Sequence, residues 1–170
     1  MYIEILTLAQ IIEKPRHAYE IRTNINQIIV DYKKINNNTL YPLMKKMETA
    51  GYINKDIHIQ TGKPNKAIYS ITELGYQYFH QLLTTFTSKE ATNEMEFYTR
   101  VLLFNYLNKE EIKEILSKRY EILLNRQKFY QMYEDNTVFS SANKHDMLFH
   151  LINNLDNEIN YIHFLNNKYL

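Results

Sequence analysis

Residues 38–51 read NTLYPLMKKMETAG, and this stretch decides the fold. It predicts a helix with an apolar stripe at three- and four-residue spacing, formed by Leu40, Leu43, Met44, Met47 and Ala50. The opposite side is polar and cationic and carries Tyr41, Pro42, Lys45 and Thr49. A DNA major groove admits such a helix, because lysine can reach phosphates or guanine edges and threonine or tyrosine can bond phosphate.

Both ends of this helix carry residues that are typical of helix caps. Residues 36–39 supply N-cap chemistry, which places Pro42 in the first turn, where its missing N–H is harmless. Gly51 stands where a left-handed C-cap is expected.

Two further helices are predicted upstream. The apolar run over residues 2–12 is too continuous for periodicity to separate a buried helix from a strand, but its length favours a helix. Residues 14–16 break it, and a second apolar stripe follows at Ala18, Ile21, Ile25 and Ile28. Tyr19, Arg22 and Asn26 face away from that stripe.

Downstream, the period changes from helical to alternating. Ile53, Ile57 and Ile59 alternate with polar residues, as do Ala67, Tyr69 and Ile71 with their neighbours, so two strands flank a basic loop at residues 61–66. Thr72 then caps another helix, which carries Tyr76, Phe79 and Leu83. The order of three helices, a hairpin and a linking helix is that of a winged helix-turn-helix.

Composition bounds the function. The 170 residues carry a net charge of +1, which creates no global field, yet residues 31–66 hold seven lysines against three acidic side chains. Such lysines are also typical of an ordinary solvated surface.

The chain contains no cysteine, which excludes thiolate metal sites and cysteine nucleophiles. The six histidines show no metal-binding or catalytic spacing. We expect no enzyme, no metal and no cofactor. No stretch is apolar enough to span a bilayer, so we expect a soluble, cytoplasmic protein.

The polar stretch 84–93 indicates a boundary, with a winged domain over 1–86 and a helical domain over 87–170. In the second domain, a heptad seam predicts a helix-pairing surface: Leu148, Ile152, Leu155, Ile159 and Ile162. Because the seam covers only about three heptads, packing within one chain is a rival interpretation.

The motifs of the first half, taken together, resemble the PadR family of bacterial transcriptional regulators. Three segments match in order and spacing: residues 15–21 (PRHAYEI), 38–53 (NTLYPLMKKMETAGYI) and 62–75, which hold GKP and YSITELG. Ala18 stands where the family often has glycine, and Asn65 where it is often basic. The resemblance implies a homodimer, usually a repressor, whose third helices enter successive major grooves of a pseudo-palindromic operator.

The resemblance also implies roles for residues. Thr39, Tyr41 and Lys45 are assigned to the groove, with Pro42 and Lys46 beside them. Tyr19 is assigned to a phosphate, and Lys63 and Lys66 to the wing. Asn38 is ambiguous between the helix cap and a DNA contact, and we favour the cap.

Family members often sense small aromatic or phenolic molecules, so release of the repressor by such a ligand is expected. Arg100, between Phe97 and Phe104, is a candidate partner for an effector carboxylate, although aromatic residues at helical spacing are more often core. The resemblance expects the C-terminal helices to pair the subunits. The alternative function is a winged-helix protein-interaction module that does not bind DNA.

Overall fold

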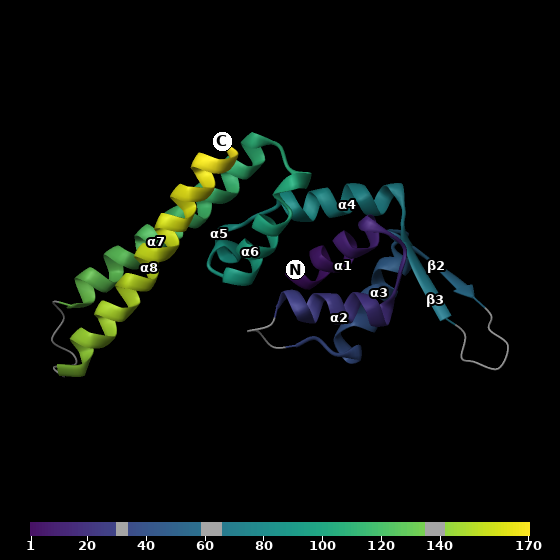
Figure 1. The fold of residues 1–170 in the computed structure, drawn as a ribbon, viewed down its shortest axis with the longest axis horizontal. Coiled ribbons are helices and arrows are strands. Elements are labelled where there is room, and N and C mark those ends of the chain that lie inside the picture. Colours follow the sequence, from purple (N-terminus) through teal and green to yellow (C-terminus); the bar gives the residue numbers. More distant parts are fainter. Residues whose placement is uncertain (30–33, 59–65, 135–141) are drawn as a thin grey trace. The chain divides into compact units, whose positions relative to one another are not determined.

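The computed structural model describes residues 1–29, 34–58, 66–134 and 142–170. The chain divides into two compact units, Met1–Thr85 and Phe86–Leu170. The elements of the first unit are α1 (Tyr2–Glu13), β1 (Arg16–His17), α2 (Ala18–Ile28), α3 (Asn37–Thr49), β2 (Ile53–His58), β3 (Lys66–Ile71) and α4 (Glu73–Thr84) (Figure 1). The predicted winged helix-turn-helix, mostly helical in class, is confirmed.

The core of the first unit explains the continuous apolar run at the N-terminus. Ile5, Leu6, Leu8 and Ile11 of α1 are all buried, so the run is a helix surrounded by other elements. In α2, Ala18, Ile21 and Ile25 are buried as predicted, but Ile28 is 41% exposed. The prediction for Ile28 was wrong because α2 ends there and the C-cap residue, Ile29, turns into the core instead.

The sheet has a third strand that sequence reasoning missed. β3 lies between β1 and β2 and pairs antiparallel with both, with Arg16 opposite Tyr69 and Ile53 opposite Ile71. β1 is only two residues long, too short to show an alternating pattern. Ile57 points outward at 60% exposure, so only the base of the wing contributes to the core, while Ile59 lies outside the described residues.

A junction between α3, the wing and α4 holds the first unit together. Gly51 adopts φ +76°, and its N–H and that of Tyr52 donate to the carbonyls of Glu48 and Met47, which closes α3 as predicted. The Thr72 hydroxyl donates to the carbonyls of Gly51 (2.7 Å) and Tyr52 (3.0 Å) and accepts from Gly75 N–H (2.9 Å). One threonine therefore ties the end of α3 to the beginning of α4.

Gly75 allows the close approach that this junction needs. A Cβ at Gly75 would lie 1.9 Å from the Tyr52 carbonyl oxygen, so any side chain there would force the backbones apart. The glycine of the Thr-x-x-Gly motif is therefore a packing requirement.

A second contact joins α4 to α1. The Tyr78 hydroxyl donates to Glu4 Oε1 (2.9 Å), and the Tyr78 ring stacks on Tyr52 with centroids 4.0 Å apart. Burial, followed by the hydrogen bond to Glu4, raises the pKa of Tyr78 to about 12.

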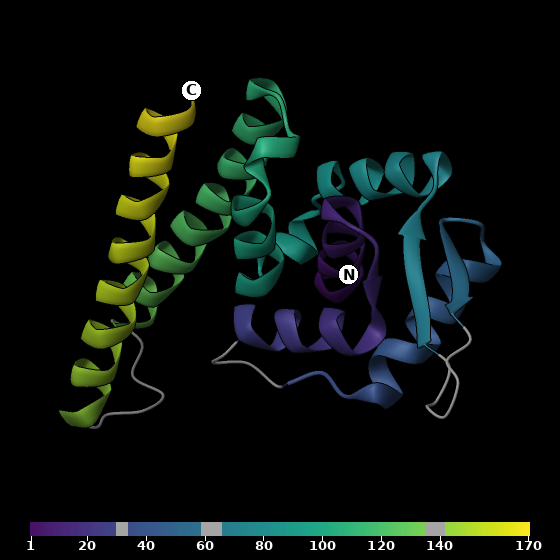
Figure 2. The same cartoon turned by 45° about the vertical axis from the view of Figure 1, so that its right-hand side comes forward.

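The second unit is helical in all its described elements: α5 (Ser88–Ala91), α6 (Glu94–Leu102), η1 (Phe104–Tyr106), α7 (Lys109–Glu134) and α8 (Ala142–Tyr169). The long helices α7 and α8 lie side by side as a hairpin (Figures 1 and 2). Within the described residues, no helix is long and apolar enough to cross a membrane.

The heptad seam of α8 packs within the chain. Leu148, Leu155 and Ile162 are buried in a single copy, and Leu155, Ile159 and Ile162 join a core with Ile115, Leu116 and Leu123 of α7. Ile152 is half-buried. The assignment of this seam to an interface between chains was therefore wrong, because α7 of the same chain covers it; the rival interpretation holds.

Substituting Gly75→Ala is expected to destabilise the chain by about 3 kcal/mol, because the new methyl group overlaps a backbone carbonyl that cannot move freely. Gly51→Ala is the matched control: its nearest neighbour would be Leu74 Cδ2 at 4.0 Å, so only the left-handed backbone is strained, at about 1 kcal/mol. Urea unfolding followed by circular dichroism measures both. Equal losses would contradict the close approach.

Tyr78→Phe is expected to lower stability at about pH 8 by about 1 kcal/mol, through loss of the hydrogen bond to Glu4. The pKa of Tyr78 is raised by folding, so its contribution is complete below the ordinary value of 10.0 and is lost as pH rises through about 12. The difference in the free energy of unfolding between the wild type and the variant should therefore shrink above pH 10. Urea unfolding midpoints across the alkaline range measure it. A difference that stays constant would count against this pairing.

Candidate nucleic-acid interface

Helix α3 begins earlier than the sequence suggested. Its N-cap is Asn36, whose Oδ1 accepts from Thr39 N–H (3.1 Å). The preference for Asn38 as the cap was wrong, because three asparagines in a row offer the same chemistry and only geometry selects among them. Pro42 consequently sits inside the helix, beyond the first turn, and has no N–H to donate to the Asn38 carbonyl.

The two faces of α3 are separated as predicted. Leu40, Met44 and Met47 are almost completely buried and Leu43 is half-buried. The prediction for Ala50 was wrong, because it is the exposed C-cap residue at the end of the helix. The exposed outer surface includes six residues assigned to DNA: Asn38, Thr39, Tyr41, Pro42, Lys45 and Lys46. We call these six the reading face.

Lys45 is available to a nucleic acid. Its side chain is 72% exposed, and its Nζ lies 3.2 Å from Glu48 Oε2. An exposed ion pair of this kind contributes little and can be exchanged for a phosphate contact.

The beginning of α2 lies beside the reading face. Tyr19 is 66% exposed, and a hollow of 590 Å³ lies between α2, α3 and β3, lined by His17, Ala18, Tyr19, Glu20, Tyr41, Ala67 and Tyr69. Two exposed tyrosines, one from each helix, therefore flank one concave surface. Burial, followed by the charge of Glu48, raises the pKa of the Tyr69 hydroxyl.

His17 couples α2 to the wing. It is the N-cap of α2, its backbone N–H donates to Glu20 Oε2 (3.0 Å), and its Nδ1 lies 2.8 Å from the Ala67 carbonyl oxygen. The hydrogen bond from His17 is the main reason that the pKa of Glu20 is lowered. Lys66, expected in the loop, is the first residue of β3, and Lys63 lies outside the described residues.

Two further residues of α2 position the reading face, and sequence reasoning saw only that they face away from the core. The Asn26 amide makes two hydrogen bonds to Ile35: its Nδ2 donates to the carbonyl (2.9 Å) and its Oδ1 accepts from the N–H (2.8 Å). Arg22 donates to Asn37 Oδ1 (2.6 Å) and lies over the Tyr19 ring, 5.3 Å from its centroid. Their four-residue spacing was visible in the sequence, but their partners, Asn37 and Ile35, lie outside α2.

The residues assigned to an effector are core residues. Phe97 and Phe104 are buried, and the fully buried Arg100 donates to Glu96 Oε2 (3.0 Å) and lies over the Phe86 ring. An effector carboxylate at Arg100 would have to displace Glu96, so the structure offers no open site between these aromatic residues.

Residues 6–81 match the model of the transcriptional regulator PadR-like family. The first unit of this chain therefore belongs to that family. The PadR-like family is one of transcriptional regulators, not of enzymes, so the reading face belongs to a regulator.

The sequence likeness to one relative extends beyond the matched residues. The negative transcriptional regulator PadR of Bacillus subtilis (strain 168) is 25% identical over 154 residues, which cover 87% of this chain and 85% of that protein. Its crystal structure in complex with operator DNA aligns over both whole chains, with 18% identity and a TM-score of 0.48. A Streptococcus mutans structure covers 94% of this chain and 95% of its own, with 22% identity and a TM-score of 0.43.

Substituting Asn26→Ala should release the segment before α3 and leave the buried backbone of Ile35 without its two partners. We expect a loss of stability of about 2 kcal/mol. The matched control is Gln27→Ala, an exposed amide on the same helix, for which we expect a change within about 0.5 kcal/mol. Urea unfolding measures both, and equal effects would contradict the positioning role of Asn26.

Proposed function

We propose that this chain is an operator-binding repressor that acts as a homodimer and is released from DNA by a small ligand. The observation that carries the proposal is the reading face itself: exposed lysine, threonine and tyrosine side chains on a helix whose other side is buried. In a major groove, the face would combine phosphate and base-edge contacts. The name of the 25% identical relative, a negative transcriptional regulator, favours repression.

Each side chain has a role in this proposal. Thr39, Tyr41 and Lys45 contact the groove, and Tyr19 bonds a phosphate from the beginning of α2. Lys63 and Lys66 of the wing segment contact the phosphate backbone of the DNA. The +4 charge of residues 31–66 favours phosphate contacts, each of which releases counterions and makes binding salt-dependent.

Homodimerisation needs a surface other than the heptad seam. Near the described ends of α7 and α8 that precede and follow residues 135–141, large apolar side chains are exposed: Phe129, Met132, Met147 and Phe149. A contiguous patch of exposed apolar side chains is typical of a protein interface, and we propose that these four form one. A two-fold dimer would present two reading faces about 34 Å apart, one turn of the duplex.

A winged-helix module that binds only protein is the alternative. This alternative predicts no salt-dependent affinity for DNA. Selection of bound fragments from the source genome, followed by titration at several salt concentrations, separates the two functions. Sedimentation of the complex should give two chains for each operator.

For the selected operator, Lys45→Ala should weaken binding about tenfold. If Lys45 meets a phosphate, the salt slope should fall by about 1; if it meets a base, sequence preference at that position should relax instead. Lys113→Ala, which removes an exposed lysine of α7, is the control and should change neither. Behaviour of Lys45→Ala indistinguishable from this control would refute the groove assignment.

A further inference from the structure

A second hollow of the first unit is lined by two cations and, among the described residues, by no carboxylate. It measures 420 Å³ and lies between α2 and the segment that leads into α3. Its described lining is Tyr19, Arg22, Thr23, Asn26, Gln27, Lys34, Ile35 and Asn36. Residues 30–33, outside the described part, hold one aspartate and one lysine and so add no net charge. We call this the cationic hollow.

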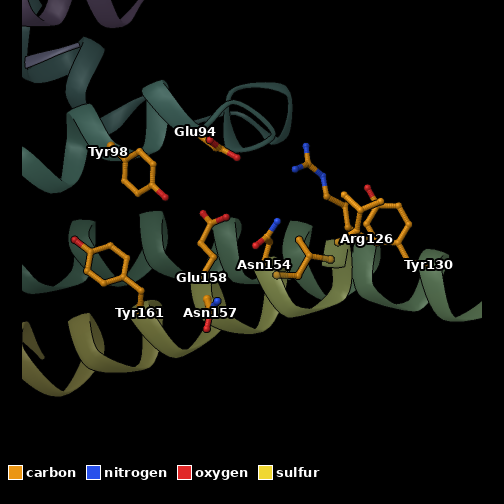
Figure 3. Close-up of a pocket in the computed structure, with 10 residues that line it drawn as sticks. Glu94, Tyr98, Arg126, Tyr130, Asn154, Asn157, Glu158 and Tyr161 are labelled. Atoms are coloured by element: carbon orange, nitrogen blue, oxygen red, sulfur yellow. The ribbon is translucent and has the colours of Figure 1, made fainter. Parts of the chain in front are cut away.

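Its charge distinguishes the cationic hollow from two others in the described parts of the chain. The 590 Å³ hollow beside the reading face contains Glu20 and no lysine or arginine. A 540 Å³ cavity of the second unit, between α6 and the α7–α8 hairpin, contains Glu94 and Glu158 together with Arg126 (Figure 3). Of these three, the cationic hollow has the lining that attracts an anion.

Arg22 is positioned at the cationic hollow by two contacts. Its Nη1 donates to Asn37 Oδ1 (2.6 Å), and its guanidinium lies over the Tyr19 ring, 5.3 Å from the centroid. A guanidinium carries five N–H donors, so the bond to Asn37 does not exhaust it. Its planar fork matches the oxygens of a phosphate group. Because Arg22 is already held in place, it loses little freedom when it binds an anion.

Two further sources of positive charge lie at the same hollow. Lys34 is exposed and belongs to the segment before α3. Asn36, also in the lining, is the N-cap of α3, and the N–H groups of a helix N-terminus carry partial positive charge. The charges of Arg22 and Lys34 and the dipole of α3 therefore favour the same anion.

Tyr19 connects the cationic hollow to the surface proposed to face DNA. It lines both this hollow and the larger one that Tyr41 borders. An anion in the cationic hollow would therefore lie next to the reading face. In a duplex, the anions beside the groove are the backbone phosphates.

We propose that the cationic hollow binds a backbone phosphate of the operator through Arg22 and Lys34, with Tyr19 bonding the same phosphate. The inference rests on the proposed function. It places the phosphate in the hollow that holds cations rather than in the larger one, which holds Glu20. Because every duplex presents phosphodiesters, this contact adds affinity without sequence preference.

Lys34→Ala tests the contact, because the Lys34 side chain is exposed. At about 0.15 M salt the variant should bind the selected operator about fivefold more weakly, and its salt slope should fall by about 1. A scrambled duplex of the same length should lose affinity by the same factor. Lys34→Arg, which keeps the charge, should bind like the wild type. Lys113→Ala on α7 is again the control and should change neither quantity.

Methylphosphonate replacements, each of which removes the charge of one operator phosphate, locate the contact. At one position in each half-site, the replacement should weaken wild-type binding about fivefold and leave the affinity of Lys34→Ala almost unchanged. Normal binding by the wild type, with Lys34→Ala equal to Lys113→Ala, would overturn this inference and leave the proposed function standing. A wild type that binds no duplex would instead contradict the proposed function, and this inference with it.

A phosphorylated small molecule would supply the same chemistry from another source. Calorimetric titration of the DNA-free chain with inorganic phosphate separates the two. We expect no saturable binding in the micromolar range, because a free phosphate lacks the other contacts of the duplex. Micromolar binding that is lost in Lys34→Ala would assign the hollow to a small molecule and overturn the DNA contact.

Discussion

The close approach of α4 to the end of α3 is the constraint on which the first unit depends. With no side chain at Gly75, the α4 backbone reaches the Tyr52 carbonyl, and Thr72 bonds both Gly51 and Tyr52. This contact fixes where the wing leaves α3 and where α4 begins. The orientation of the reading face relative to the wing is therefore set by backbone atoms and the Thr72 hydroxyl, and it does not depend on the exposed side chains of that face.

The reading face is held at both ends. The Gly51 cap and Thr72 hold its C-terminal end, while Asn26 and Arg22 of α2 hold the segment that leads into it. Between these points, Leu40, Met44 and Met47 anchor the helix in the core. Rigid support of this kind reduces the cost of ordering a binding surface. The second unit shows a similar support, because the buried Arg119 holds Glu158 in place at the wall of a cavity.

The periodicity of apolar residues and the helix-capping residues correctly predicted the features that neighbouring residues in the sequence determine. The buried stripe of α3, the Gly51 cap and the Thr72 cap all follow from residues close in sequence. Prediction was wrong where a distant partner decides. β1 exists only because β3 pairs with it, and α7 covers the α8 seam. The sequence suggested that Arg100 could bind an effector carboxylate, but Glu96 and Phe86 already occupy its surroundings. Spacing shows which face a residue occupies but not what covers that face.

Affinity cleavage from α3 tests the central claim most directly. The sequence has no cysteine, so Thr49→Cys, at an exposed position of α3 outside the reading face, provides a single attachment point for an iron chelate. On the selected operator, the account predicts two clusters of cuts about one helical turn apart, one from each α3. A chelate attached through Glu110→Cys on α7 should not reproduce them. Cuts that are absent, or identical for the two attachment points, would contradict the claim that α3 reads DNA.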